Sequence, residues 1–235
     1  MPHLSVILPL YRTADALEEL LARLCATLEA ARLTFEIIAV DDACPHGSGD
    51  RLTFLAARDP RVVPVHLACN VGQQRAVWRG LQSARGEHIA IMDADLQDEP
   101  EHLPALLQIL ASRPVHAVFA GRRGHYQQHS RMATSYLFKR LLHLIAHVPP
   151  DAGSYVVMTR AMANSVLRFQ VPNPYMLALI GATRLPVTSI PVPRASRPNG
   201  HSAYSEWTRL QFAWRGLRTA VATRLQNRGT SWITN

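Results

Sequence analysis

The sequence predicts an α/β fold with a mostly parallel central sheet flanked by helices. Two observations support this prediction. Between residues 4 and 121, short apolar runs alternate with longer segments whose apolar residues recur every three or four positions. The chain of 235 residues is 48% apolar and 18% charged, which suits a globular protein with a sizeable core. Strict alternation of strand and helix is typical of a parallel sheet with helices on both faces.

The first half of the chain supplies most of the expected elements. Each expected strand is a short apolar run, and the runs span residues 4–9, 35–40, 61–67, 88–93 and 116–121. The expected helices lie between them, at 14–32, near 49–58, at 72–84 and at 100–112. One face of the first helix collects Leu17, Leu20, Leu21, Leu24 and Leu28. Each helix can therefore cover the sheet between two neighbouring strands.

After residue 121 the pattern changes. Two more strands are expected, at 154–159 and 186–192, followed by a loop at 193–205. Segments 131–147 and 206–226 place leucine and aromatic residues at helical spacing, with basic residues between them. This pattern is typical of a helix that lies in a membrane interface, although ordinary core packing produces it as well.

The charge of the chain indicates anionic partners. The net charge is +8 and the isoelectric point about 10.1, which favours nucleic acid, acidic lipid or phosphorylated small molecules. Nucleic acid is the least expected, because the cationic residues are not interleaved with aromatic residues on a sheet face. The three cysteines are far apart in the sequence, which predicts a reducing, cytoplasmic environment. No charged leader precedes the first apolar run, so a signal peptide is not expected. No apolar window reaches about 18 residues, so a membrane-spanning helix is not expected either.

Carboxylates gather where the expected strands end. The strand ends carry Pro9-Leu10-Tyr11, Asp41-Asp42 and Asp93-Ala94-Asp95, and in parallel sheets ligands bind beyond the carboxyl ends of the strands. Asp93 and Asp95 would point to the same side of an extended segment and repel each other. A hard divalent cation, Mg²⁺ or Mn²⁺, removes that conflict and typically shares its ligands with a substrate phosphate. The alternative is a solvated acidic turn that caps the next helix.

Two nucleotide-binding folds are excluded by missing motifs. No G-x-G-x-x-G follows the first strand, and no G-x-x-x-x-G-K-[ST] occurs in the sequence. The chain is therefore expected to be neither a dinucleotide-binding protein nor a P-loop kinase.

Four stretches of the sequence resemble a known family. They read "SVILPLY", "VDDACPHGSGD", "DPRVVPVHLACNVGQQRAVWRGLQSARGEHIAIMDADLQDEPEHLP" and "RASRPNGHSAY". In this order and spacing they resemble family 2 glycosyltransferases, and among these the dolichyl- and polyprenyl-phosphate glycosyltransferases. The resemblance implies a GT-A-type glycosyltransferase domain over 1–205, with a nucleotide-sugar half at 1–121 and an acceptor half at 122–205. An amphipathic C-terminal helix and tail, 206–235, would follow.

The resemblance also assigns site residues. A metal ion, Mg²⁺ or Mn²⁺, would be held by Asp93, Asp95 and Gln97, and Asp151 is a further catalytic candidate. The nucleotide would contact Pro9, Leu10, Tyr11, Val40, Asp41, Asp42, Gln73, Asp93, Ala94 and Asp95, with Asp42 accepting a hydrogen bond from the base. The acceptor phosphate would contact Arg122, Arg131, Ser135, Arg194, Arg197 and Ser202. Arginine suits this task because its planar fork matches phosphate oxygens.

The sequence departs from the family pattern at several of these places. Thr13 stands where relatives usually have a glutamate that often contacts the nucleotide, so the base preference stays open. Ser154 and Val156 replace an acidic residue and an arginine, so a role at those two positions is not carried over. Ala203 replaces the lysine of the family's closing loop. Because these charges are missing, the sequence also allows the hypothesis that the protein binds the donor without efficient catalysis.

Three functions remain as hypotheses from the sequence. The first is a metal-dependent inverting glycosyltransferase that moves a sugar from a nucleotide-sugar donor to a polyprenyl phosphate. It would work at the cytoplasmic face of a membrane, attached peripherally or through a membrane-protein partner. The second keeps the donor but transfers to a sugar hydroxyl of a growing glycan, which would need a carboxylate base such as Asp151 or Asp98. The third is a catalytically weak nucleotide-sugar-binding subunit. The sequence leaves the sugar and the oligomeric state open.

Overall fold

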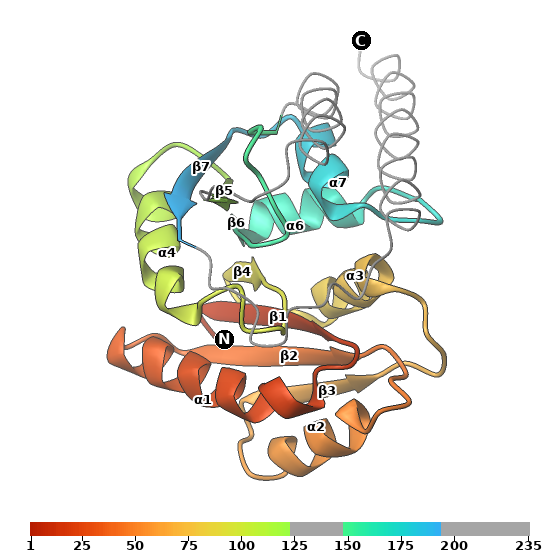
Figure 1. Cartoon of the computed structure of the whole chain (residues 1–235). Coiled ribbons are helices and arrows are strands. Elements are labelled where there is room, and N and C mark those ends of the chain that lie inside the picture. The colour runs from red at the N-terminus through yellow and green to blue at the C-terminus, as the bar shows by residue number, and fades with distance from the viewer. Residues whose placement is uncertain (123–147, 194–235) are drawn as a thin grey trace, which may run out of the picture.

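A seven-stranded sheet forms the centre of the computed structural model, which describes residues 1–122 and 148–193 (Figure 1). In spatial order the strands run β3-β2-β1-β4-β6-β5-β7. Their bounds are β1 Leu4–Leu10, β2 Phe35–Asp41, β3 Val62–His66, β4 His88–Ile91, β5 Ala117–Arg122, β6 Val156–Thr159 and β7 Val187–Val192. Every expected strand is therefore present, with ends that differ by one or two residues.

Strand β6 is the one described strand that runs against the others. It pairs antiparallel with β4 on one side and with β5 on the other, whereas the remaining neighbours pair in parallel. The prediction of a mostly parallel sheet is confirmed. The described sheet departs from a fully parallel arrangement only at β6, which enters the gap between β4 and β5 from the opposite end of the sheet.

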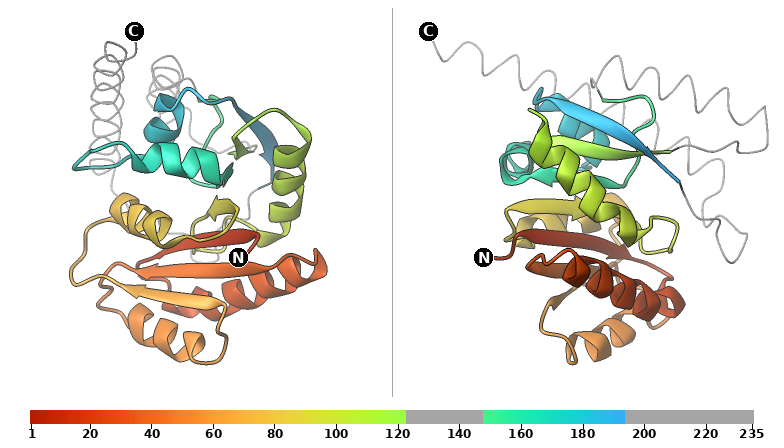
Figure 2. Two further views of the ribbon diagram at one scale, coloured as in Figure 1. Left: turned by 180° about the vertical axis from the view of Figure 1, so that it is seen from behind. Right: turned by 90° about the vertical axis from the view of Figure 1, so that its left-hand side faces the viewer.

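Helices cover both faces of the sheet, as predicted (Figures 1 and 2). One face is covered by α1 Ala14–Ala30, α2 Ser48–Ala56 and α4 Leu103–Ser112, which follows the short 3₁₀ turn η1 Pro100–His102. The other face is covered by α3 Gln73–Ser83, α6 Arg160–Leu167 and α7 Met176–Ala182. Of the described helices, none has the length and apolar character needed to cross a membrane.

Side chains of β1 enter the cores on both faces of the sheet. Leu4, Val6, Leu8 and Leu10 pack with the helices of the first face, and Ile7 packs with those of the second. A strand that is buried on both sides needs a nearly continuous apolar sequence, which is what "LSVILPL" provides. The two cores therefore hold β1 in place, and the carboxyl end of β1 lies at the predicted site.

Two helices, α6 and α7, were not expected from the sequence. They are eight and seven residues long, which is too short to display a clear helical period. Helix α6 has one recognisable local signal, since the hydroxyl of Thr159 accepts a hydrogen bond from the backbone amide of Met162 at 3.2 Å. The expected helices 131–147 and 206–226 lie outside the described residues.

Candidate active site

The carboxyl ends of β1, β2 and β4 lie side by side, as the sequence predicted. Leu10 is in register with Asp41 in the neighbouring strand, and Ile7 is in register with Ile91 on the other side. The loops that follow these strands carry Tyr11, which is 40% exposed, and the two acidic pairs. Three loops from distant parts of the sequence therefore meet at one edge of the sheet.

A left-handed backbone conformation occurs in all three loops. Arg12 after β1, Ala43 after β2 and Leu96 after β4 have φ values of 59°, 48° and 62°. This conformation costs a residue other than glycine about 1–2 kcal/mol, and such residues concentrate at functional sites. Three of the five described non-glycine residues with positive φ thus lie at the predicted site, and the other two, Arg32 and Arg184, follow α1 and α7.

Asp93 is held from two sides by neutral donors. The side-chain amide of Gln73, the first residue of α3, donates to Oδ1 of Asp93 at 2.6 Å. The hydroxyl of Ser154, just before β6, donates to Oδ2 at 2.9 Å. The carboxylate orientation is thus fixed by one residue from each half of the chain. The sequence marked Ser154 only as a departure from the family pattern, so this contact was missed.

The loop that carries Asp93 and Asp95 is bent, which corrects the expectation of an extended segment. Strand β4 ends at Ile91, two residues earlier than expected, and the turn is closed by local hydrogen bonds. Oδ2 of Asp98 accepts from the backbone amide of Asp93 at 3.0 Å, and Oδ1 of Asp95 accepts from that of Gln97 at 3.2 Å. Asp98 is only 5% exposed. Its carboxylate therefore shapes the loop, which weakens its candidacy as a catalytic base.

Asp42 organises the loop that leads into α3. Its two carboxylate oxygens accept backbone hydrogen bonds from Val71 and Gly72, at 2.7 and 2.8 Å, and the residue is 2% exposed. Burial raises the pKa of Asp42; the two amide hydrogen bonds oppose this, and the charge of Asp41 raises the pKa further. Gly72 has a φ of +88°, which favours glycine at this point. Base recognition by Asp42 stays a prediction, beside the structural role seen here.

The other predicted nucleotide-binding residues lie at the same edge but differ in exposure. Pro9, Leu10, Val40 and Ala94 are buried, and Leu10 and Val40 have no exposed area at all. Asp41 is 7% exposed, and its Oδ1 accepts from the amide of Cys44 at 3.2 Å. Among the strand-end residues, Tyr11 has the most exposed side chain, so it is the best placed to reach a ligand.

Cys44 connects the loops after β1 and β2. Its sulfur accepts a hydrogen bond from the backbone amide of Arg12 at 3.1 Å and another from the hydroxyl of Ser48 at 3.2 Å. Burial acts to raise the pKa of the Cys44 thiol, but the hydrogen bond from Ser48 and those from backbone amides outweigh it and lower the pKa. The sequence indicated only that this cysteine forms no disulfide framework, so its position here was missed.

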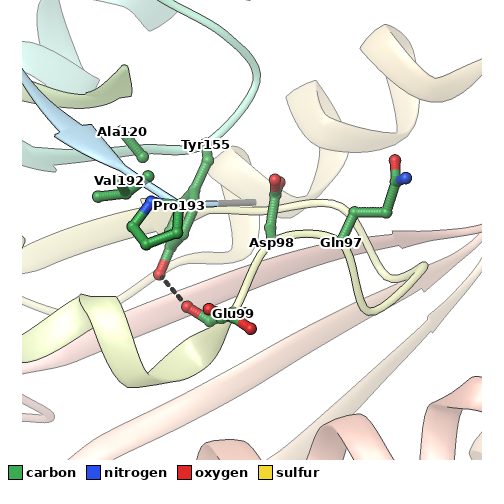
Figure 3. Close-up of a pocket in the computed structure, with 7 residues that line it drawn as sticks. All are labelled: Gln97, Asp98, Glu99, Ala120, Tyr155, Val192 and Pro193. Atoms are coloured by element: carbon green, nitrogen blue, oxygen red, sulfur yellow. Dashed lines mark hydrogen bonds between the residues drawn. The ribbon is translucent and has the colours of Figure 1, made fainter. Parts of the chain in front are cut away.

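Tyr155 joins the acidic loop to the second half of the sheet (Figure 3). Its hydroxyl donates to the backbone carbonyl of Glu99 at 3.0 Å. Burial raises the pKa of Tyr155 well above the ordinary value, and the charges of Asp98, Glu101 and Glu99 raise it further, so the hydroxyl stays a donor. A cavity of about 10 Å³ remains beside the ring, lined by Gln97, Asp98, Glu99, Ala120, Tyr155, Val192 and Pro193. In Figure 3 the Gln97 side chain points away from the tyrosine.

Asp151 lies beside the carboxyl end of β5 and contacts β7. Its Oδ1 accepts a hydrogen bond from the hydroxyl of Ser189 at 2.7 Å. A Cβ atom at Gly121 would overlap its Oδ2, so the carboxylate packs directly against the backbone there. Asp151 is therefore anchored to the strands of the second half, and its catalytic role stays a prediction.

Comparison with known proteins decides the family. The sequence model described as Glycosyl transferase family 2 matches residues 5–171. The chain belongs to this family. It is therefore a glycosyltransferase, as the resemblance in the sequence predicted.

Two curated relatives illustrate how far the similarity extends. The uncharacterized glycosyltransferase YkcC of Bacillus subtilis is 26% identical over 219 residues, which cover 92% of this chain and 67% of that protein. The undecaprenyl-phosphate 4-deoxy-4-formamido-L-arabinose transferase of Erwinia tasmaniensis is 31% identical over 228 residues, covering 94% of this chain and 69% of that protein. The glycosyltransferase described here thus spans about two thirds of the length of these relatives.

A solved structure confirms the fold. Glucosyl-3-phosphoglycerate synthase from Mycobacterium tuberculosis, in complex with Mn²⁺, uridine diphosphate and phosphoglyceric acid, superposes with a TM-score of 0.69 at 17% identity. The match covers 94% of this chain and 78% of that one. The fold of the glycosyltransferase is therefore of the GT-A type, as predicted.

The donor atoms of the acidic loop suit a hard divalent cation. Asp93 and Asp95 supply carboxylate oxygens, and the side-chain amide of Gln97 offers another oxygen close by in the sequence. Mg²⁺ and Mn²⁺ prefer such ligands. The orientation imposed on Asp93 by Gln73 and Ser154 fits a carboxylate that must present its remaining lone pairs in a fixed direction.

Most of the predicted acceptor residues lie outside the described part of the chain. Arg122 is the last residue of β5, and its backbone pairs with Val192 in β7. The positions named beyond it, Arg131, Ser135, Arg194, Arg197 and Ser202, all fall in residues 123–147 or 194–235. Contacts of these residues with an acceptor phosphate remain predictions from the sequence.

Proposed function

We propose that this glycosyltransferase transfers a sugar from a nucleotide-sugar donor to a polyprenyl phosphate, with a divalent metal ion and inversion at the anomeric carbon. The observation that carries the proposal is the acidic loop at the carboxyl ends of β1, β2 and β4, in which Asp93 is oriented from both sides. The relative from Erwinia tasmaniensis, whose name specifies undecaprenyl phosphate, supports the acceptor. The Mn²⁺ and uridine diphosphate of the structural neighbour support the metal and the donor class.

The residues of this chain would bind and position the donor. Asp93 and Asp95, with Gln97, would hold the metal ion, which when bound supplies Lewis-acid stabilisation of the leaving nucleoside diphosphate. Gln73 and Ser154 keep the Asp93 carboxylate in place. Asp42 fixes the loop of residues 70–72, and the loop that carries Tyr11 borders the same edge.

A phosphate acceptor explains why a general base is not a necessary part of this site. A polyprenyl phosphate is already anionic near neutral pH, so it needs cationic partners more than it needs a base. Arg122 and the predicted arginines of the acceptor half, Arg131, Arg194 and Arg197, would supply them. The net charge of +8 would favour peripheral contact with an anionic cytoplasmic membrane surface.

The proposal is tested by nucleotide release and sugar transfer with the purified full chain. UDP-, GDP- and dTDP-sugars are offered with Mn²⁺ or Mg²⁺, in the presence of a short polyprenyl phosphate, a sugar acceptor, phosphoglyceric acid or no acceptor. We expect release of one nucleotide that depends on both the metal and the polyprenyl phosphate. Asp95→Ala should abolish it, whereas Ser165→Ala, which removes an exposed hydroxyl in α6, should not.

Other outcomes would redirect the assignment. Transfer to the sugar and not to the lipid phosphate would replace the polyprenyl phosphate with a glycan acceptor. Transfer to phosphoglyceric acid would make a small phosphorylated acid the acceptor. Metal-dependent donor binding without turnover on any acceptor would instead support a nucleotide-sugar-binding subunit.

A further inference from the structure

Two histidines and a glutamate meet at the opposite end of the sheet from the acidic loop. His3 precedes β1, while Glu87 and His88 lie at the start of β4. One ligand atom from each of the three residues lies within 4.8 Å of the other two. Of the residues that the structure describes, no other set of three histidine, cysteine or acidic side chains comes this close together.

The backbone holds these three residues in fixed register. The amide of His88 donates to the carbonyl of His3 at 2.9 Å, and the amide of Glu87 donates to the carbonyl of Pro2 at 3.2 Å. Leu4 pairs with His88 in the parallel ladder of β1 and β4. The cluster therefore rests on two central strands and not on a mobile surface loop.

The side chains sit close together but are not packed shut. Nδ1 of His3 lies 3.3 Å from Oε2 of Glu87, and their side chains are 38% and 70% exposed. The ring centroids of His3 and His88 are 4.7 Å apart. In a tetrahedral zinc site with bonds of about 2.0 Å, ligand atoms are about 3.3 Å apart. The His3–Glu87 pair already has this spacing, and all three ligand atoms lie within 4.8 Å of one another.

His88 has the properties of a metal ligand. Its Nδ1 is buried and has no hydrogen-bond partner among the described residues, which is unusual for a buried polar atom. Histidine can bind a metal ion through either of its two ring nitrogens, so a buried ring nitrogen without a partner is available as a ligand.

We propose that His3, Glu87 and His88 form a binding site for a borderline divalent transition-metal ion such as Zn²⁺. Two imidazoles and one carboxylate are a common zinc ligand set, with a water molecule as fourth ligand. The ligand set differs from the oxygen ligands of the acidic loop, so the two sites would select different metals. A metal ion here would link the residue before β1 to the start of β4 and stabilise the fold.

The proposal is tested by zinc titration of the metal-free full chain in excess Mg²⁺, which is added to fill the metal site proposed in the acidic loop. We expect isothermal titration calorimetry to show one Zn²⁺ per chain. Loss of a residue that orients a metal ligand typically lowers metal affinity by about tenfold or more, and loss of a ligand itself should lower it at least as much. His3→Asn and Glu87→Gln should therefore each weaken Zn²⁺ binding by about tenfold or more. Zn²⁺ should also raise the melting temperature of the parent protein more than that of either variant.

A matched control distinguishes this site from any histidine–glutamate pair. Nε2 of His102 lies 3.1 Å from Oε2 of Glu99, but no third ligand is near enough to complete a triad within the described residues. His102→Asn should therefore leave Zn²⁺ affinity unchanged. Absence of stoichiometric binding, or equal affinity in His3→Asn, Glu87→Gln and the parent protein, would overturn the proposal. Loss of Zn²⁺ binding in Asp95→Asn alone would place the ion in the acidic loop and also overturn it.

Discussion

At the scale of single residues, the arrangement around Asp93 is the most informative feature of the site. Ser154, which the resemblance in the sequence marked as a departure from the family pattern, donates its hydroxyl to Asp93 at 2.9 Å. A neutral donor orients the carboxylate without adding a second negative charge beside it. Ser154 therefore contacts the acidic loop without adding to its negative charge.

Removal of the Ser154 hydroxyl should reduce the free energy of metal-dependent donor binding more than it reduces the free energy of unfolding. In Ser154→Ala, Asp93 loses one of its orienting hydrogen bonds, and loss of such a partner typically lowers metal affinity by about 10–100-fold. Calorimetric titration with the active nucleotide sugar and Mn²⁺ measures the change. Ser165→Ala removes a comparable hydroxyl far from the loop and serves as the control. Equal affinities in the two variants would show that Ser154 does not position the carboxylate.

At the scale of elements, α3 connects the two halves of the protein. Beside the contact of Gln73 with Asp93, the side-chain oxygen of Gln74 accepts from the amide of Met176 at 2.8 Å. Arg75 donates to the carbonyl of Pro172 at 2.8 Å. The first turn of this helix therefore sets the position of both the acidic loop and the segment before α7. The distance between α3 and the sheet should therefore affect the positions of the acidic loop and of the segment before α7.

Gly80 sets that distance, and a larger residue should disturb it. A Cβ atom at this position would lie 2.5 Å from Cγ2 of Ile7, a β-branched side chain that moves little. Gly80→Ala should destabilise the protein by about 1–3 kcal/mol through overpacking, partly offset by up to about 1 kcal/mol of helix propensity. Urea unfolding of this variant beside Gln82→Ala, an exposed change in the same helix, measures the effect. An unchanged or higher midpoint for Gly80→Ala would show that α3 can shift freely.

At the scale of the whole molecule, a buried carboxylate joins three segments of the chain. Glu36 in β2 is 3% exposed and accepts from the hydroxyl of Ser5 at 2.7 Å and from the backbone amide of Arg85 at 2.7 Å. The guanidinium of Arg85 lies 2.8 Å from the same carboxylate. Burial acts to raise the pKa of Glu36, but these hydrogen bonds and the charge of Arg85 outweigh it and lower the pKa.

Glu36 should make folding sensitive to acid. Because its pKa in the folded state is below the ordinary value of 4.5, its contribution is present above about pH 4.5 and is lost as the pH falls through the folded pKa. Glu36→Gln should cost about 1–3 kcal/mol of unfolding free energy near pH 7. The difference from the parent protein should then shrink as the pH is lowered below 4.5.

Denaturant unfolding at a series of pH values tests this prediction. Asp59 and Glu101 also have lowered pKa values, because Arg61 and Arg23 donate hydrogen bonds to them. The parent protein and Glu36→Gln both contain Asp59 and Glu101. The difference between their unfolding free energies therefore reports on Glu36 alone. Glu29→Gln, which removes an exposed partner of Arg61, should change stability by no more than about 1 kcal/mol. A cost of Glu36→Gln that stays constant from pH 7 to pH 3 would contradict the assignment.

The sequence by itself determined the family, the fold class and the edge of the sheet at which the predicted site lies. Apolar periodicity is a local property, so it located every strand of residues 1–122 and 148–193 and those helices there that are long enough to show a period. The acidic residues lie at or shortly after the ends of their strands, so Asp41, Asp42, Asp93 and Asp95 could be placed at one edge once the strands were taken as parallel neighbours.

Only the tertiary structure decided which distant segments contact these residues. The reversed direction of β6, the bend after Ile91 and the contact of Ser154 with Asp93 all depend on segments far apart in the sequence. The meeting of His3 with Glu87 and His88 depends on the pairing of β1 with β4. Such contacts form because strand pairing and core packing bring distant segments together, and neither composition nor local spacing records which partners will meet.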